Sequence, residues 1–276
     1  NPNFNYSGRA LTSIIESSKI DKTKDFGYET ARTGLTFATR FEQYDDFYIS
    51  PSVDTYFETL ETTSTASASY KKQRGNYFDT NFSYGLDLDK RDQKYQPTGG
   101  YRSTFNQSLP IYSDTPSLLN TYVFTKYNDF ENITTSLSFF GNTINSLSDD
   151  DVRISKRVFM PERRLRGFEA GKIGPVDNND FIGGNYASSI NFVANFPKIL
   201  PTFQEIEFNY FIDAANVWGV DYSDTIASSN EIRSSTGIAL NWFTPIGPLN
   251  FSLAQALTKA STDKTETFRF NIGTTF

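Results

Sequence analysis

The sequence predicts an all-β, transmembrane antiparallel β-barrel, and three observations lead to that fold class. Aromatic residues make up 16% of a chain whose charged fraction is 21% and whose mean hydropathy is -0.48. Apolar and polar residues alternate with period two along several segments. Many of these segments approach the ~9–11 residues with which a tilted strand crosses a bilayer. Because one face of such a strand meets lipid and the other meets water, a polar chain can carry many aromatic residues.

The alternation is clearest in the second half of the chain. In 204–214 the even positions from Ile206 to Ile212 are apolar, while Asp213 lies on the other, largely polar face together with Phe211. The same period holds in 78–89 and in 267–276. A soluble β-sandwich also alternates, but its strands usually run about 5–6 residues. The greater length of the present segments therefore favours the membrane barrel.

Candidate strands number about twelve, and an even number is typical of a bacterial barrel. Segments rich in Gly, Pro, Asn and Asp separate most of them. The exception is 145–184, which alternates weakly and contains several arginines; loops of this length are usually functional or disordered. The predicted strands are 8–19, 28–40, 46–59, 76–89, 100–110, 118–129, 132–144, 185–196, 204–214, 231–243, 249–258 and 264–276.

Composition excludes several functions. The chain has no His and no Cys, which removes His-based catalysis, disulfides and thiolate metal sites and disfavours an enzyme. Carboxylate-only chemistry stays formally open. A net charge of -6 without a basic stripe argues against nucleic-acid binding. No run of eighteen apolar residues is present, so no transmembrane helix is expected. We expect neither a cofactor nor a metal.

Four groups of residues occur in a distinctive order. The first is a turn motif, the second a long-loop motif, the third the strand 211–218, and the fourth the terminal strand. Any one of them is weak evidence, whereas the ordered combination is specific. The turn motif is Asp89, Arg91, Asp92, Pro97, Thr98 and Gly99; the loop motif is Arg166, Gly167, Phe168, Ile173, Gly174 and Pro175; the terminal motif is Phe268, Phe270, Ile272, Gly273 and Phe276.

Together these motifs resemble the C-terminal barrel of the outer-membrane assembly superfamily, which also includes two-partner-secretion transporters. The resemblance implies a sixteen-stranded barrel in the outer membrane of a Gram-negative bacterium. Residues 1–276 would then be the C-terminal part of that barrel, and 145–184 would fold into its lumen. Four strands and the periplasmic repeat domains are expected upstream of Asn1.

The resemblance also suggests a role for the loop arginine, since in this family it meets acidic residues that project into the lumen. Asp213 faces the lumen by parity, and an arginine fork can bond a carboxylate in two places. We therefore expect an Arg166–Asp213 contact, with Phe168 packed beside it and Gly167 allowing close approach to the wall. The alternative is a solvated, unpaired Arg166. The inward positions of 187–195 carry no carboxylate, so Asn191 is expected to add only a neutral acceptor.

The resemblance implies assembly and insertion of β-barrel proteins by strand templating at a lateral seam. An edge strand offers unpaired N–H and C=O groups to a client strand, and the strand that ends at Phe276 is the expected meeting place. The implied partners are the lipid bilayer, unfolded outer-membrane proteins and accessory lipoproteins. Two other functions stay open: an exporter of the same superfamily that passes one secreted partner, and a passive porin.

Overall fold

The structure of the protein is a computed structural model that describes residues 9–131, 133–196, 206–222, 226–227, 230–244 and 247–272. Within these residues twelve strands form one antiparallel sheet, and each strand pairs with its neighbours along the chain. In sheet order they are β1 (Ala10–Lys22), β2 (Tyr28–Tyr44), β3 (Phe47–Thr62), β4 (Gly75–Arg91), β5 (Gly100–Ser113), β6 (Ser117–Phe130), β7 (Ile133–Ser146), β10 (Tyr186–Asn195), β11 (Ile206–Trp218), β13 (Arg233–Thr244), β14 (Gly247–Thr258) and β15 (Phe268–Ile272). The predicted all-β class and the twelve predicted strands are confirmed.

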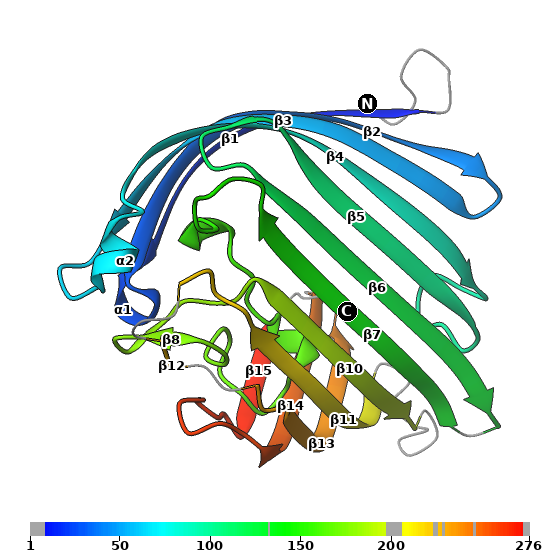
Figure 1. Ribbon diagram of the computed structural model, residues 1–276. Coiled ribbons are helices and arrows are strands. Elements are labelled where there is room, and N and C mark those ends of the chain that lie inside the picture. Colours follow the sequence, from blue (N-terminus) through cyan, green and yellow to red (C-terminus); the bar gives the residue numbers. More distant parts are fainter. Residues whose placement is uncertain are drawn as a thin grey trace.

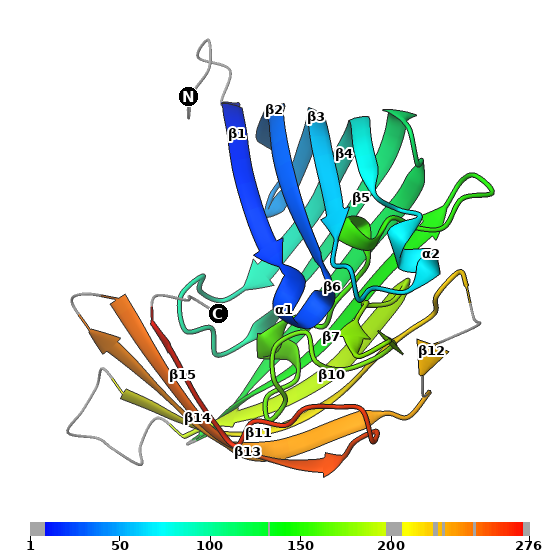
Figure 2. The ribbon, with the colours of Figure 1, turned by 90° about the vertical axis from the view of Figure 1, so that its left-hand side faces the viewer.

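The sheet curves into an open arc rather than lying flat (Figure 1). In the described part of the chain β1 and β15 each pair with one neighbour, so they form the two edges of the arc. Figure 2 shows these edges well apart from one another. The concave side of the arc corresponds to the lumen of a barrel, and the convex side to its lipid-facing surface.

Period-two alternation separates the two faces of every long strand, as β7 illustrates. Leu137 and Phe139 are 51% and 41% exposed on the convex face, whereas Ser138 and Phe140 are buried on the concave face. Successive side chains of a strand point to opposite faces, so apolar residues at every second position give a continuous apolar outer surface. Such a surface suits a strand in contact with lipid.

The long connection between β7 and β10 lies within the curve of the sheet (Figure 1). It contains two short 3-10 helices, Ile154–Lys156 and Glu162–Arg164, and a hairpin of β8 (Val176–Asp177) and β9 (Asp180–Phe181). β8 also pairs with β12 (Ile226–Ala227). The main apolar core joins this connection to the concave wall; it comprises Phe140, Ile144, Val152, Val158, Met160, Leu165, Phe168, Ile173, Ala187, Ala215 and Val217.

Two short helices, which the sequence did not predict, lie at the end of the sheet that carries the long loops. They are α1 (Thr23–Phe26) and α2 (Ala68–Lys71). A second apolar cluster joins this end of the sheet to the loop: Tyr28, Leu60, Ala66, Tyr70, Ile154 and Ile182. Among the described residues, no helix is long and apolar enough to span a membrane.

The last strand is shorter than predicted. The sequence predicts a strand over 264–276, but β15 begins at Phe268. Residues 264–266 leave the sheet because their backbone bonds to the long loop instead. Gly273 and Phe276 of the terminal motif lie outside the described residues.

Candidate functional site

The carboxylate of Asp213 is the centre of the loop's contact with the wall. Asp213 is fully buried on β11, and its oxygens accept hydrogen bonds from Arg166 Nε (2.8 Å), Arg166 Nη2 (2.7 Å) and the Arg166 backbone N–H (3.1 Å). The side chain of Arg166 is 17% exposed. Two parallel bonds from the guanidinium fork give a geometry that a lysine cannot reproduce. The structure thus brings together the two residues that the sequence analysis pairs.

Asn191 completes the shell of Asp213, but as a donor. It lies directly opposite Asp213 on β10, and its Nδ2 donates to Asp213 Oδ1 (2.8 Å) and to the carbonyl of Arg164 (2.7 Å). Its Oδ1 accepts from Ser189 Oγ at 3.0 Å. The expectation that Asn191 adds only a neutral acceptor is wrong, because both groups that face its nitrogen are acceptors themselves.

The residues around Arg166 hold its backbone against the wall. The guanidinium stacks 3.6 Å from the centre of the Phe211 ring, and Ser235 Oγ donates to the Arg166 carbonyl. Gly167 follows with φ +88°, and a Cβ there would lie 3.1 Å from that of Ala254. An L side chain rarely adopts this φ, so glycine is needed both for the backbone and for the close approach.

The rest of the loop motif packs in the main core. Phe168 and Ile173 are 1% and 3% exposed. Gly174 has φ +96°, and a Cβ there would lie 2.9 Å from the Cβ of Val217. Pro175 is buried, and its carbonyl accepts from Ile182 N–H at 3.2 Å. The motif is therefore a continuous stretch that presses the loop onto β11 and its neighbours.

A second ionic anchor, which the sequence analysis missed, holds the start of the loop on β3 and β4. Arg153 is 1% exposed and forms ion pairs with Asp79 and with Glu58 (Nε to Oε1, 3.3 Å). Lys156 Nζ lies 2.7 Å from Asp79 Oδ1, and Ser155 Oγ donates to Glu58 at 2.6 Å. Because Asp79 is fully buried, two cations share one desolvated carboxylate.

Part of this second anchor was present in the sequence pattern. Asp79 falls on the polar face of its strand by the same alternation that orients Asp213. No pattern in 149–157 identifies Arg153 as its partner, since the path of a long loop depends on tertiary contacts.

Arg164 is a further cation of the loop, and it points to the wall of β7. Its Nη1 donates to Ser138 Oγ at 2.7 Å, and its guanidinium lies 5.4 Å from the centre of the Phe140 ring. Burial, followed by the neighbouring positive charge of Arg163, lowers the pKa of Arg164 to about 10. The group stays charged at neutral pH and keeps its attraction to the polar wall.

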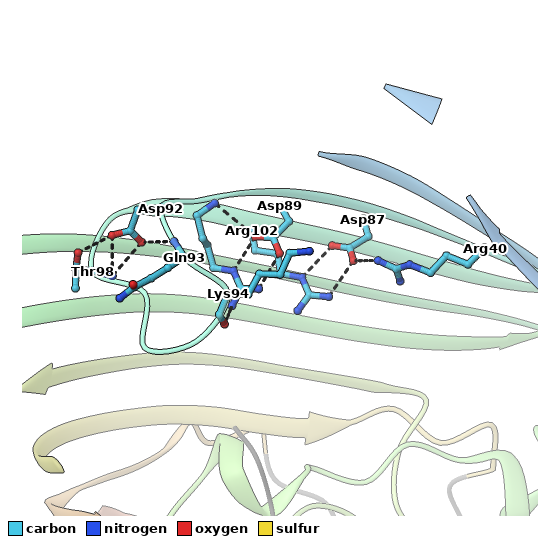
Figure 3. A network of polar contacts seen from close by, with 9 residues as sticks. Arg40, Asp87, Asp89, Asp92, Gln93, Lys94, Thr98 and Arg102 are labelled. Carbon is cyan, nitrogen blue, oxygen red and sulfur yellow. Dashed lines mark hydrogen bonds and ion pairs between the residues drawn. The ribbon is translucent and has the colours of Figure 1, made fainter. Parts of the chain in front are cut away.

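The turn motif spans the end of β4 and the turn that leads to β5, and Figure 3 shows Asp89, Asp92 and Thr98 there. The carboxylate of Asp92 accepts from Thr98 N–H (3.1 Å) and Thr98 Oγ1 (2.6 Å), which closes the turn. The carboxylate of Asp89 accepts hydrogen bonds from Nε and Nη2 of Arg91, both at 2.7 Å. The constrained glycine is Gly100 rather than Gly99: its φ is +85°, and a Cβ there would lie 2.1 Å from the Lys90 carbonyl.

The polar network continues from this turn along the concave wall. Asp87 lies between two arginines and accepts from Arg40 Nη2 and from Arg102 Nε, both at 2.9 Å (Figure 3). The turn also reaches the far side of the arc. Gln96 donates to Glu207 of β11, and the rings of Tyr95 and Phe243 lie 5.4 Å apart. The turn between β4 and β5 therefore contacts both β11 and β13.

The terminal strand is bonded to the loop as well as to β14. Its motif residues Phe268, Phe270 and Ile272 face outward with exposures of 53%, 42% and 62%. On the inner face, Arg269 Nη2 donates to the Phe168 carbonyl at 2.6 Å, and Asn271 Nδ2 donates to Glu162 Oε1 at 3.3 Å. The loop motif is thus in direct contact with the edge of the sheet.

Replacement of the motif arginine, Arg166→Ala, should lower the free energy of unfolding by about 3–5 kcal/mol, because it leaves the buried charge of Asp213 without its cation. Arg163→Ala is the matched control, since Arg163 is exposed in the same loop. Urea-induced unfolding, followed by the loss of the folded band in unheated electrophoresis samples, measures both. Equal stabilities of the two variants would contradict the anchoring role.

An acidic residue at position 191 should lower the free energy of unfolding more than alanine does. Asn191→Asp removes the donor that faces Asp213 and places a second carboxylate within reach of the first, where like charges repel at low dielectric. Asn191→Ala loses the same donor without adding a charge. The same unfolding assay should rank the variants wild type, then Asn191→Ala, then Asn191→Asp; a reversed order of the two variants would show that the site accommodates a second carboxylate.

The second anchor is tested by Asp79→Asn, which leaves Lys156 with a neutral partner and removes one of the two carboxylates that pair with Arg153. We expect a loss of about 3–5 kcal/mol in the free energy of unfolding, as for other broken buried pairs. The exposed Asp45, in the turn between β2 and β3, gives the control Asp45→Asn, expected within about 0.5 kcal/mol of wild type. A similarly small effect of Asp79→Asn would exclude this anchor as a source of stability.

The chain is similar to several known proteins. The whole chain, residues 1–276, matches the Omp85 superfamily domain. It is 27% identical over 275 residues to the outer membrane protein assembly factor BamA of Neorickettsia risticii, which covers 97% of this chain and 37% of that protein. It is 25% identical over 171 residues to the human sorting and assembly machinery component 50 homolog, covering 58% of this chain and 36% of that protein.

Among solved structures, the crystal structure of BamA from Haemophilus ducreyi lacking POTRA domains 1–3 superposes with a TM-score of 0.85. The sequence identity is 22%, and the match covers 98% of this chain and 59% of that chain. This likeness confirms the predicted barrel fold. The chain spans less than two fifths of the length of the two curated relatives. Because the family model matches the chain from residue 1 to residue 276, the chain belongs to the Omp85 superfamily and is an outer-membrane β-barrel protein.

Proposed function

We propose that this barrel assembles β-barrel proteins and inserts them into the outer membrane, with client strands templated at the edge formed by β15. The observation that supports templating is the bonding of this edge. β15 pairs with β14 on one side, and its inner face is held by the loop through Arg269 and Asn271. A strand edge fixed in this way offers backbone N–H and C=O groups in a defined position, as strand addition requires.

The relatives agree with a role in assembly. One is named as an outer membrane protein assembly factor and the other as a component of a sorting and assembly machinery. The clients of the present protein would be unfolded outer-membrane proteins, and the bilayer would be its second partner. Accessory lipoproteins, four further strands and periplasmic repeat domains belong to the same proposal.

The loop motif would contribute rigidity rather than chemistry. Buried ion pairs with β4 and β11 connect distant parts of the wall, so the edge is presented by a braced sheet. Templating needs neither a nucleotide nor a catalytic group, because the free energy comes from backbone pairing and from burial of apolar client residues in lipid.

The proposal is tested with the full-length, purified protein in proteoliposomes. An eight-stranded outer-membrane barrel, unfolded in urea, is added, and its folded fraction is followed by electrophoresis of unheated samples. The wild-type protein should accelerate folding relative to empty liposomes. Arg166→Ala should fold the client more slowly, while Arg163→Ala should match the wild type.

Two results would count against assembly. Equal client folding in empty and loaded liposomes would remove the templating role. A large, steady ion conductance in planar bilayers, unchanged when the loop is deleted, would indicate a passive porin instead.

A further inference from the structure

The pairing of the last two strands stops abruptly beside the loop motif. β14 and β15 pair from Leu249 with Ile272 to Leu253 with Phe268, and Ala254 N–H donates to the Thr267 carbonyl at 2.8 Å. β14 itself continues to Thr258 and stays paired with β13 on its other side. In the described residues no strand pairs with the outer edge of 255–258.

The chain that would cover this edge is bonded to the loop. Phe168 and Thr265 form an antiparallel bridge. Glu169 N–H donates to the Lys264 carbonyl (3.0 Å), and Glu266 N–H donates to the Gly167 carbonyl (3.1 Å). Arg269 adds a side-chain bond to the Phe168 carbonyl at 2.6 Å. Residues 264–266, here called the departing segment, thus use the loop motif as their strand partner.

The sheet offers the same segment a second place. Continuing the observed register of β14 and β15 by three residues sets Gln255 opposite Glu266, Ala256 opposite Thr265, and Leu257 opposite Lys264. A polar cavity of about 140 Å³ lies between β14 and the departing segment, with Gly167, Ala256 and Thr265 in its lining. There is space beside the β14 edge for the segment to enter.

Pairing of the departing segment with the loop motif and pairing with β14 involve the same kind of interaction. Each gives the segment backbone hydrogen bonds, and one such bond contributes little net free energy when it replaces another. The bias toward the loop comes from side chains: Phe168 is buried at 1% exposure, and the loop beneath it is held by Arg166 on Asp213. An element with two similar pairings and a local anchor is a two-state device.

We infer that residues 264–266 exchange between the loop motif and the free edge of β14, so that the Arg166–Asp213 anchor sets how far the last strand extends. When the anchor holds, β15 is short and the β14 edge at 255–258 is open. When it releases, β15 lengthens toward the loop-bearing end and covers that edge. The inference deepens the proposed function, on which its biological meaning rests, because it makes the lumen loop control the length of the templating edge.

Disulfide trapping in the membrane-embedded, full-length protein tests the exchange. Residues 1–276 contain no cysteine, so the introduced pair supplies the only cysteines of this part of the barrel. Leu257→Cys with Lys264→Cys reports the extended strand: since Ala254 and Thr267 are a hydrogen-bonded pair, 257 and 264 would be a non-hydrogen-bonded pair, whose side chains approach most closely. Leu253→Cys with Phe268→Cys is the control for the pairing already present.

The 257–264 pair should form slowly in the otherwise wild-type protein. Arg166→Ala should raise the ratio of cross-linked to free chain about tenfold, as expected when a charge-assisted anchor is removed from a two-state equilibrium. Arg269→Gln, which leaves the Arg166–Asp213 pair in place, should raise it by a smaller factor. Arg163→Ala should leave it unchanged, and the 253–268 pair should form equally in all variants.

Unchanged 257–264 cross-linking in Arg166→Ala and Arg269→Gln, with the control pair intact, would overturn the exchange. If Arg166→Ala loses the control pair as well, Arg269→Gln alone decides. The readout is conformational and needs no client. Cross-linking as expected without accelerated client folding would therefore contradict the proposed function and support the exchange. Accelerated client folding without the expected change in cross-linking would support the function and contradict the exchange.

Discussion

The contacts on the concave side of this barrel depend on one fully buried carboxylate, that of Asp213. A charge without solvent must be compensated by a cation and by donors in good geometry, and the fork and backbone N–H of Arg166 together with Asn191 meet that requirement. Docking of Arg166 fixes the positions of Gly167 and Phe168, which in turn bond the chain that leads into β15. The position of the terminal edge therefore depends on a series of contacts that begins at the carboxylate of Asp213.

The loop works as a brace because it is fixed at two distant places. Its start is bonded to β3 and β4 through Arg153, and its motif to β11 through Arg166. At the other end of the strands, the turn between β4 and β5 reaches β11 through Gln96. An open arc held at both ends resists changes of curvature, whereas a sheet paired only along its strands could flex. The arrangement joins a rigid wall to an edge with alternative pairings.

Period-two alternation was enough to predict the strands and the inward direction of Asp213, because in a strand both depend on local sequence. The donors of Asn191 were not predictable, since an amide can donate or accept according to what faces it. Arg153 was missed for a related reason: its partner Asp79 is 74 residues away. The predicted start of the terminal strand at 264 was wrong. The segment 264–266 has a strand pattern that suits pairing with β14 or with the loop motif, and tertiary contacts decide between these two partners.

The sequence distance between the loop and its partners bears on the order in which the chain folds. Arg153 must meet residues made long before it, while Arg166 must wait for Asp213, and Glu162 for Asn271, which lies 109 residues later. Contacts of such separation carry a large loop-closure entropy and slow folding. During synthesis and transit the loop arginines would be solvated and unpaired, and the strands before the loop would exist without their brace. The last strand would then add the final contacts of the loop, because Arg269 and Asn271 bond Phe168 and Glu162 only after β11 has supplied Asp213 to Arg166.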